Sequence, residues 1–186
     1  MRKISTFCFL TINGYYKGSK EDISWHIHSE EGNRFSEEQL KSGNVLLFGR
    51  VTYEMMQQFW TSEEARSRYP EVARMMNEAE KVVLSRTLSA ATWQNSRLIS
   101  ENALTAIRQF KATAGKNITI LGSGSIVRQL SEMAMIDEYQ FMIDPLAIGK
   151  GTPLFEGLEH TLSLKLKETD ILQSTGTLLL TYERKD

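Results

Sequence analysis

The stretch Leu46–Tyr53 reads Leu-Leu-Phe-Gly-Arg-Val-Thr-Tyr and predicts a buried strand that turns directly into a helix. The run Val45–Phe48 is short and continuously apolar, which is typical of a strand covered on both faces. A helix is expected over Val51–Phe59, and Gly49 permits the tight turn before it. Unpaired N–H groups at the start of such a helix, together with the helix dipole, favour an anion. This stretch therefore predicts an α/β protein with a nucleotide-phosphate site.

The same alternation of strand and helix fills the first two-thirds of the chain, whereas the last third is rich in strands. Residues 13–22 contain two glycines and are expected to form turns. The whole pattern predicts a mostly parallel central sheet with helices on both faces and antiparallel C-terminal strands. Further strands are expected at Ile4–Ile12, Lys81–Ser85, Arg97–Ile99, Asn117–Leu121, Tyr139–Ile143, Leu162–Leu166 and Thr177–Glu183, and further helices at Glu37–Ser42 (capped by Ser36), from Pro70, at Ala103–Ala112 and at Ser125–Met133.

Composition limits the class of protein. The 186 residues suit one domain, expected over 1–186, and the formal net charge of -1 gives no overall positive field for nucleic acid or an anionic membrane. Cys8 is the single cysteine, so no internal disulfide can form and a cytoplasmic location is expected. No apolar run approaches the length that crosses a bilayer, and polar residues interrupt the N-terminal stretch in a way that suits a strand better than a signal peptide.

Three turns with a common chemistry follow three of the expected strands. Ligands of parallel sheets bind at the carboxyl ends of the strands, so these turns are the candidate site. Arginine offers a bidentate partner for phosphate, and hydroxyl groups add neutral donors. Each turn alone has an ordinary explanation, a topological connection with solvated arginines, but three together favour a phosphorylated cofactor. The turns are Gly49-Arg50-Val51-Thr52, Ser85-Arg86-Thr87 and Gly122-Ser123-Gly124-Ser125.

A Rossmann dinucleotide site is the alternative interpretation of the third turn. The segment Gly122–Val127 supplies two of the three fingerprint glycines and has valine at the third place. Asp144 follows at about the distance of a ribose-binding carboxylate. However, Pro145 comes directly after it, and Asp144 is expected to end a strand. The match to a Rossmann fingerprint is therefore weak.

Several stretches in a fixed order resemble a known family. Residues 46–52, with Trp60 beyond them, resemble the cofactor turn of the dihydrofolate reductase fold. More specifically, the chain is similar to the reductase domain of the bacterial riboflavin-biosynthesis deaminase/reductase and its stand-alone relatives. The supporting stretches are Thr11–Gly14, Ser24-Trp25, Lys81–Ser85, Ile120–Gly124, Ile136–Tyr139, Pro145–Gly151 and Pro153–Phe155.

The resemblance implies NADPH-dependent reduction of a small, heterocyclic or carbonyl substrate. In that family the first and third turns hold the pyrophosphate and the middle turn meets the 2′-phosphate. The absence of a carboxylate beside Arg86 favours NADPH over NADH. The cofactor-binding residues carried over are Gly49, Arg50, Thr52, Ser85, Arg86, Thr87, Gly122, Ser123, Gly124 and Ser125.

The substrate half of the site departs from the family pattern. Riboflavin-pathway enzymes typically have aspartate at the position of Asn13 and glutamate at that of Leu121, so the riboflavin intermediate is not the expected substrate. Asn13 and Trp25 are the candidate substrate-binding residues. Asp22 is the candidate proton donor, as a partly buried carboxyl with a raised pKa. The alternative for Asp22 is a solvated loop residue or a helix cap.

Metal binding and assembly leave weaker signals. His26 and His28 would share one face of a strand, and Glu30 and Glu31 follow them, but no cysteine or other histidine lies near them in sequence, and no metal is expected. The alternating segment Thr161–Glu183 offers an edge or face for pairing, and relatives are commonly dimers, so a homodimer is expected. Two other functions stay open: a non-catalytic nucleotide-binding module of the same fold, and a Rossmann-type NAD or flavin protein.

Overall fold

An eight-stranded sheet in the order β5-β4-β3-β6-β1-β7-β10-β9 forms the centre of the molecule. The computed structural model describes residues 1–185. All pairs from β5 to β7 are parallel, and β10 pairs antiparallel with both β7 and β9, so the predicted sheet is confirmed. The strands are β1 Ile4–Thr11, β3 Val45–Gly49, β4 Lys81–Leu84, β5 Ser96–Ile99, β6 Ile118–Leu121, β7 Glu138–Asp144, β9 Leu164–Leu172 and β10 Thr177–Arg184.

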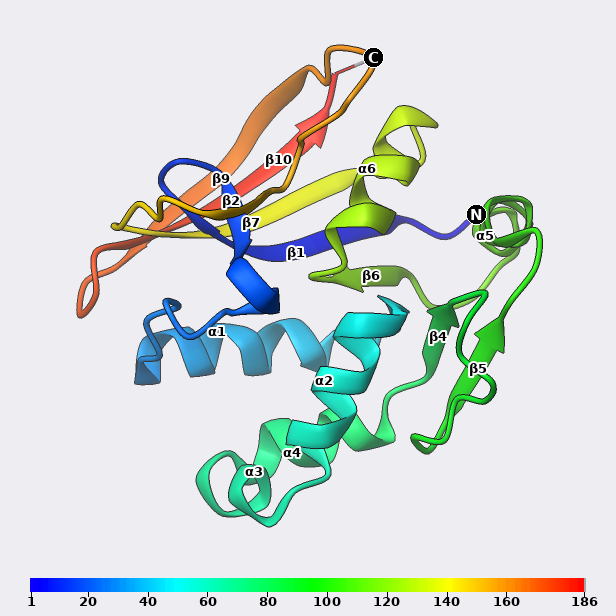
Figure 1. The fold of residues 1–186 in the computed structure, drawn as a ribbon, viewed down its shortest axis with the longest axis horizontal. Helices are drawn as coiled ribbons and strands as arrows, with labels where there is room; N and C mark the ends of the chain where they lie inside the picture. Colours follow the sequence, from blue (N-terminus) through cyan, green and yellow to red (C-terminus); the bar gives the residue numbers. More distant parts are fainter. Residues whose placement is uncertain (186) are drawn as a thin grey trace.

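Helices cover both faces of this sheet, as predicted. Figure 1 shows α1 to α4 together on one side of the sheet and α6 on the other, with β9 and β10 at the end opposite to β4 and β5. We call these two sides the α1 face and the α6 face. The helices are α1 Glu30–Lys41, α2 Arg50–Trp60, α3 Glu63–Arg68, α4 Pro70–Glu78, α5 Ala103–Ala112 and α6 Gly124–Glu132.

Alternation of side chains along the strands creates a core on each face. On the α6 face, Ile107 of α5 and Leu130 of α6 pack with Ile118 and Ile120, all fully buried. On the α1 face, Tyr53 of α2 packs with strand residues such as Phe48. Each of these large apolar side chains contributes about 1.5–3 kcal/mol when fully buried.

Two local predictions were wrong. Helix α1 begins at Glu30, earlier than the predicted start at Glu37, because Ser29 and not Ser36 is its N-cap and accepts a hydrogen bond from Gly32 N. The segment expected to form only turns contains β2 (Tyr15–Gly18), which pairs antiparallel with β8 (Gly151–Pro153). The sequence did not indicate β2 because the strand is short, has glycine next to it and at its end, and pairs with a segment far away along the chain.

The helices that follow β3 and β6 leave the sheet in opposite directions. These two strands are neighbours in the sheet, yet α2 packs on the α1 face and α6 packs on the α6 face. Parallel sheets bind their ligands in the crevice opened by such a divergence. Among residues 1–185, no helix is long and apolar enough to cross a membrane.

Candidate active site

A cleft of about 800 Å³ lies at the carboxyl ends of β3, β4 and β6. These strands are adjacent in the sheet, so the turns that follow them meet at one edge. The volume falls within the range of about 300–1,000 Å³ that is typical of ligand pockets. The cleft is therefore large enough for a cofactor, and its lining is mainly polar.

Three helices begin at this cleft without a side-chain cap. The N-cap residues are Gly49 for α2, Asn102 for α5 and Ser123 for α6, and none of them accepts a hydrogen bond from the first turn through its side chain. All three residues line the cleft. The first N–H groups of a helix need acceptors, and an anionic ligand supplies them. The cleft thus presents three convergent positive helix ends.

The backbone of the third turn is shaped for a close approach to α2. Gly122 has a φ of +54°, in the left-handed region that favours glycine, and a Cβ there would lie 3.4 Å from Cγ2 of Thr52. Ser123 is left-handed as well, with a φ of 52°. Its Oγ accepts a hydrogen bond from Gly49 N at 3.0 Å. The turns after β3 and β6 therefore form one connected unit.

Positive charge is concentrated in the cleft. Arg50, Arg86, Arg128 and Lys17 line it, whereas Glu21 is its one acidic lining residue among those the structure describes. Arg50 pairs with Glu54 on α2, and because both side chains are exposed this pair is weak enough for a ligand to replace. The cleft therefore suits a phosphorylated ligand electrostatically.

The structure brings together most of the predicted cofactor residues. Gly122 lines an adjoining cavity and not the cleft, while Thr87 lines neither, and its backbone N–H donates to Ser85 Oγ. The predicted residues that line the cleft are Gly49, Arg50, Thr52, Ser85, Arg86, Ser123, Gly124 and Ser125.

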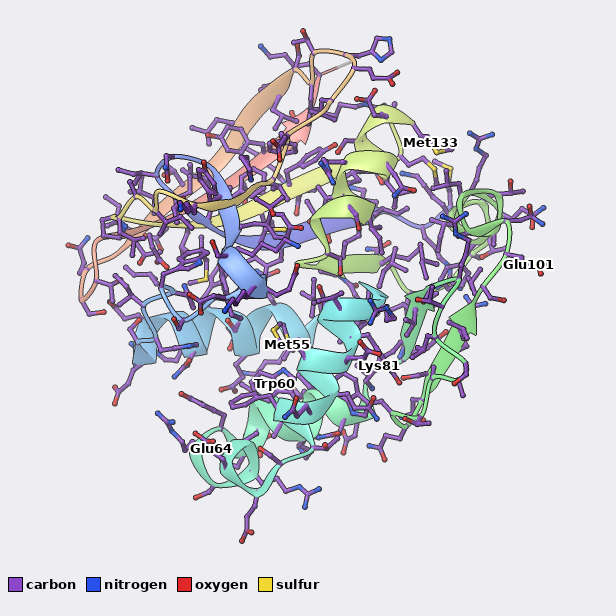
Figure 2. All side chains as sticks on the ribbon, viewed as in Figure 1. Met55, Trp60, Glu64, Lys81, Glu101 and Met133 are labelled. Atoms are coloured by element: carbon purple, nitrogen blue, oxygen red, sulfur yellow. The ribbon has the colours of Figure 1, made fainter. Side chains whose placement is uncertain are left out.

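The adjoining cavity lies between the α1 face of the sheet and helices α1, α2 and α4, and has a volume of about 170 Å³. Its floor includes Phe7 and Leu121, and its walls include Met55 and Trp60. Figure 2 shows Met55 in the space between α2 and α1. The cavity joins the cleft, since Tyr16, Lys17, Glu21, Val51, Thr52 and Ser123 line both. Cofactor and substrate would therefore meet at these six residues.

An ion pair stands at the junction of the cleft and the cavity. Lys17 Nζ lies 2.6 Å from Glu21 Oε2. Burial alone would lower the pKa of Lys17, but pairing with Glu21 outweighs it and raises that pKa. Lys17 is therefore a fixed positive charge at the junction. Tyr16 lies beside it, with its ring against Gly124 at the start of α6.

The residues expected to contact the substrate lie elsewhere. Asp22 is exposed and lines neither hollow, and hydrogen bonds from Ser24 lower its pKa. The expectation of a partly buried carboxyl with a raised pKa was wrong, because Asp22 closes a local turn. Asn13 also lines neither hollow, since its amide is bonded to Ile148 and Thr11. Trp25 lies outside both as well, and its Nε1 donates to Asp22 O.

His26, but not the exposed His28, belongs to a buried polar network. His26 Nδ1 lies 2.7 Å from Asp144 Oδ2, and Thr177 Oγ1 donates to Asp144 Oδ1 at 2.8 Å. Asp144 ends β7 as expected, but this network occupies its carboxylate. In residues 1–185 no three His, Cys, Asp or Glu side chains are placed to hold a metal ion. Burial raises the pKa of Cys8 to about 11, so this thiol is protonated at neutral pH.

Two features of the cleft were not found from the sequence. One is the first turn of α5, which lines the cleft. It was missed because the short strand β5 before this helix has only a weak apolar pattern. Strand β2 contributes Tyr16 and Lys17. The end of β5 could have indicated the position of α5. Because β5 is parallel to β4, its carboxyl end lies at the same edge of the sheet as the carboxyl ends of β3, β4 and β6.

Comparisons with known proteins agree with this architecture. The family described as "RibD C-terminal domain" matches residues 2–180. The uncharacterized protein YyaP of Bacillus subtilis (strain 168) is 25% identical over 181 residues, which cover 97% of this chain and 94% of YyaP.

Solved structures show the same fold. A Shewanella sp. PV-4 protein assigned to riboflavin biosynthesis superposes with a TM-score of 0.75 at 21% identity, covering 99% of each chain. The Thermotoga maritima diaminohydroxyphosphoribosylaminopyrimidine deaminase/5-amino-6-(5-phosphoribosylamino)uracil reductase gives a TM-score of 0.69 at 12% identity, covering 99% of this chain and 57% of that one. The fold is thus the reductase-like α/β fold that the sequence predicts.

Proposed function

Because the chain belongs to the RibD C-terminal domain family, we propose that it is an NADPH-dependent reductase of a small molecule. One observation carries this proposal: three uncapped helix ends and three arginines converge on a single cleft. Such a cleft provides N–H donors and guanidinium groups for several phosphate oxygens at once. An apolar cavity for a second molecule opens directly from it.

The residues of the cleft suit the parts of this cofactor. The first turns of α2 and α6 would hold the pyrophosphate, with the hydroxyl groups of Thr52 and Ser125 as neutral donors. Arg86 would hold the 2′-phosphate, because it is exposed at the neighbouring turn and Glu21 is the only carboxylate among residues 1–185 that lines the cleft. When bound, NADPH supplies the hydride.

The protein's own contribution is binding, orientation and exclusion of water. The junction between cleft and cavity fixes where the reacting parts would meet, and the apolar cavity walls keep water from the substrate ring. Lys17 adds a positive charge at this junction. No buried carboxylic acid lines the cavity in the described part of the chain, so we expect any proton to come from solvent.

A thermal-shift titration tests the cofactor. A ligand that binds only the folded state at 100 times its Kd stabilises it by about 2.7 kcal/mol, which raises the Tm of a chain of this size by about 5–10 °C. We expect this rise with NADPH and a smaller one with NADH. No rise with saturating NADPH would refute the proposed function.

A pair of arginine variants tests the nucleotide preference. Arg86→Ala should weaken NADPH binding about 10- to 100-fold and leave NADH binding unchanged, because a hydrogen bond to a charged group contributes about 1.5–3 kcal/mol. Arg66→Ala is the control, since Arg66 is exposed on α3 and lines neither hollow. An equal loss for both cofactors would assign Arg86 to another part of the nucleotide.

A non-catalytic nucleotide-binding module is the second candidate. The observation in its favour is that Asp22, the expected proton donor, is exposed and that its carboxylate accepts a hydrogen bond from Ser24 N within a local turn. This candidate predicts a thermal shift with NADPH but no consumption of NADPH with any acceptor. Absorbance of the reduced nicotinamide, followed over a panel of neutral and charged acceptors, separates the two functions.

We also propose that the chain acts as a cytoplasmic homodimer that pairs through β9. This strand is one of the two edge strands of the sheet, and Leu166 and Ile171 on it are exposed. Unpaired strand edges and exposed apolar side chains favour association with another chain. Sedimentation should give a dimer, and Ile171→Asp should give a monomer that still binds NADPH. A wild-type monomer at all concentrations would refute the dimer.

A further inference from the structure

The apolar cavity differs chemically from the cleft that it joins. We propose that it binds a neutral, planar, mainly apolar ring compound of the quinone type, as the acceptor of the reductase proposed above. This inference rests on the proposed function and adds the class of substrate. It excludes acceptors with a phosphate or carboxylate inside the cavity.

The size and lining of the cavity suit a flat ring. Its volume is about 170 Å³, and an apolar cavity of about 150 Å³ is large enough to bind benzene. Phe7 and Phe9 of β1 and Leu121 of β6 form a floor on the sheet. Met55 and Met56 form part of the opposite wall, and their flexible side chains can adapt to a ring. A ring would thus lie between the aromatic floor and the methionine wall.

Charge separates the cavity from the cleft. Lys17 and Glu21 are the only charged side chains among the described residues that line the cavity, and they stand at the junction and pair with each other. Deeper in the cavity no arginine, lysine or histidine would meet an anion. Transfer of an unpaired charge out of water is very costly, so a phosphate would not enter. A neutral ring carries no such cost.

Apart from Lys17 and Glu21, the polar side chains that line the cavity are neutral. Asn44 Nδ2 donates to Thr119 Oγ1 at 2.9 Å on the sheet floor, and Gln140 lies on β7. Amide and hydroxyl groups of this kind can form hydrogen bonds with the carbonyl oxygens of a quinone. A few fixed polar groups in an apolar pocket orient a ligand without requiring it to carry charge.

The cavity opens to the cofactor at one place. Val51 and Thr52, in the first turn of α2, and Ser123, before α6, line both hollows, so the edge of a ring in the cavity faces the cleft. In the reduction, the quinone gains two electrons and one hydrogen nucleus as hydride from NADPH and one proton from solvent. The quinone becomes a hydroquinone and the cofactor becomes NADP⁺, so atoms and electrons balance.

Two ligands that differ in one substituent test the charge of the acceptor. Menadione is a neutral methyl-naphthoquinone, and a naphthoquinone sulfonate has the same rings with a fixed negative charge. We would titrate both by calorimetry into the full chain saturated with NADP⁺, so that no turnover occurs. Menadione should bind about tenfold or more tightly than the sulfonate, because the sulfonate must lose water without gaining a partner. Equal or tighter binding of the sulfonate would overturn the proposal.

Two variants on one helix test the location. Met55→Asp places a carboxylate in the cavity wall, whereas Gln58→Asp places the same group on the exposed side of α2. Menadione binding should fall about tenfold or more in Met55→Asp and stay unchanged in Gln58→Asp. The thermal shift with NADPH should persist in both variants, which shows that they are folded. Unchanged menadione binding in a folded Met55→Asp protein would overturn the assignment of this cavity.

The two proposals fail in different ways. If NADPH does not raise the Tm, the proposed reductase fails, whatever menadione does. If NADPH raises the Tm but menadione does not bind, the acceptor class alone is wrong. Steady-state oxidation of NADPH with menadione then completes the test, since binding without turnover favours the non-catalytic module.

Discussion

Gly49 and Ser123 are joined by a hydrogen bond of 3.0 Å from the Gly49 amide to the Ser123 hydroxyl oxygen, although 74 residues separate them. The same hydroxyl donates to the carbonyl of Leu121 at 3.1 Å. Ser123 therefore uses its side chain to connect the two strand ends and leaves the first turn of α6 without a side-chain cap. This arrangement keeps two helix N-termini side by side and open toward the cleft.

Loss of this hydroxyl should destabilise the turn and weaken cofactor binding together. Ser123→Ala leaves the partly buried Gly49 N–H without this acceptor, and the loss of such a hydrogen bond costs about 0.5–1.5 kcal/mol. Urea unfolding should show a loss of this size, and NADPH affinity should fall as well. Ser125→Ala is the control for stability. Ser125 is exposed in the first turn of α6, and its replacement should change the unfolding free energy by less than about 0.5 kcal/mol. Similar stability for both variants would contradict this role of Ser123.

Replacement by alanine should destabilise the protein at one of two nearby glycines and have almost no effect at the other. Gly151 has a φ of +157°, and a Cβ there would lie 2.2 Å from the backbone oxygen of Lys17. Gly151→Ala must therefore push β8 from β2 and move Lys17, with a cost of about 1–3 kcal/mol. No atom lies within 4 Å of a Cβ built on Gly149, so Gly149→Ala should be nearly neutral. Thermal unfolding and NADPH affinity of the two variants would measure this contrast, and equal values would exclude it.

The sheet could be predicted because its signals are local. Continuous apolar runs such as Val45–Phe48 mark strands covered on both faces, and this run is followed directly by a helix with apolar spacing. The start of α1 could not be placed, because its sequence is strongly polar and Ser29 and Ser36 are equally good caps by type. The pairing of β2 with β8 depends on residues about 135 positions apart, which no local pattern encodes.

The position of the polar cleft was predictable for the same reason. Most of its lining residues belong to turns that directly follow recognisable strands, so sheet topology alone places them together. The adjoining cavity depends on loops and on the packing of α1 and α2 over the sheet. Asp22 was chosen for its place in the loop before Trp25 and Asn13 for its place in the family pattern, but local hydrogen bonds engage both side chains. Met55 and Phe7 resemble core residues in sequence, and only the packing shows that they surround a cavity.

Lys81 should stabilise the fold through the hydrogen bonds that its side-chain nitrogen donates. This buried side chain donates to the carbonyl oxygens of Asn77, Ala79 and Gln94 at 3.0, 2.6 and 3.1 Å, and it lies 4.5 Å from the ring centre of Trp93. Figure 2 labels Lys81 near α4 and α2. Lys81→Met removes the donor from the Asn77 and Ala79 carbonyls at the end of α4 and from the Gln94 carbonyl before β5, and we expect a loss of about 1–3 kcal/mol in urea unfolding.

The pH dependence of this loss provides a second measurement. Burial lowers the pKa of Lys81 to about 8 from 10.5, so between these values the unfolded chain binds more protons than the folded one. The contribution of Lys81 to stability therefore rises as pH increases from 8 to 10.5. The stability difference between wild type and Lys81→Met should grow over this range. Lys165→Met, at an exposed position on β9, should show no such growth, and a parallel trend in both variants would argue against a buried Lys81.

Acid should destabilise the protein in two stages, and His28 governs the first. Burial, followed by the positive charge of His26, lowers the pKa of His28 below 6.5. The folded state then binds fewer protons than the unfolded state just below pH 6.5, so the free energy of unfolding falls as pH decreases from that value. His28→Asn should remove this first decline and leave stability at pH 8 nearly unchanged, because His28 is partly exposed.

Asp144 governs the second stage, at lower pH. Burial alone would raise its pKa, but hydrogen bonds from His26, Thr177 and the Ile27 amide outweigh burial and lower it below 3.8. Stability from this carboxylate is present above pH 3.8 and is lost as pH falls through the lowered pKa. Asp144→Asn should abolish this acid-dependent loss, and it should destabilise the protein by about 1–3 kcal/mol already at pH 7, because the buried partners lose a charged acceptor. Urea unfolding from pH 8 to pH 3 for wild type, His28→Asn and Asp144→Asn would separate the stages, and a single decline shared by all three would contradict both assignments.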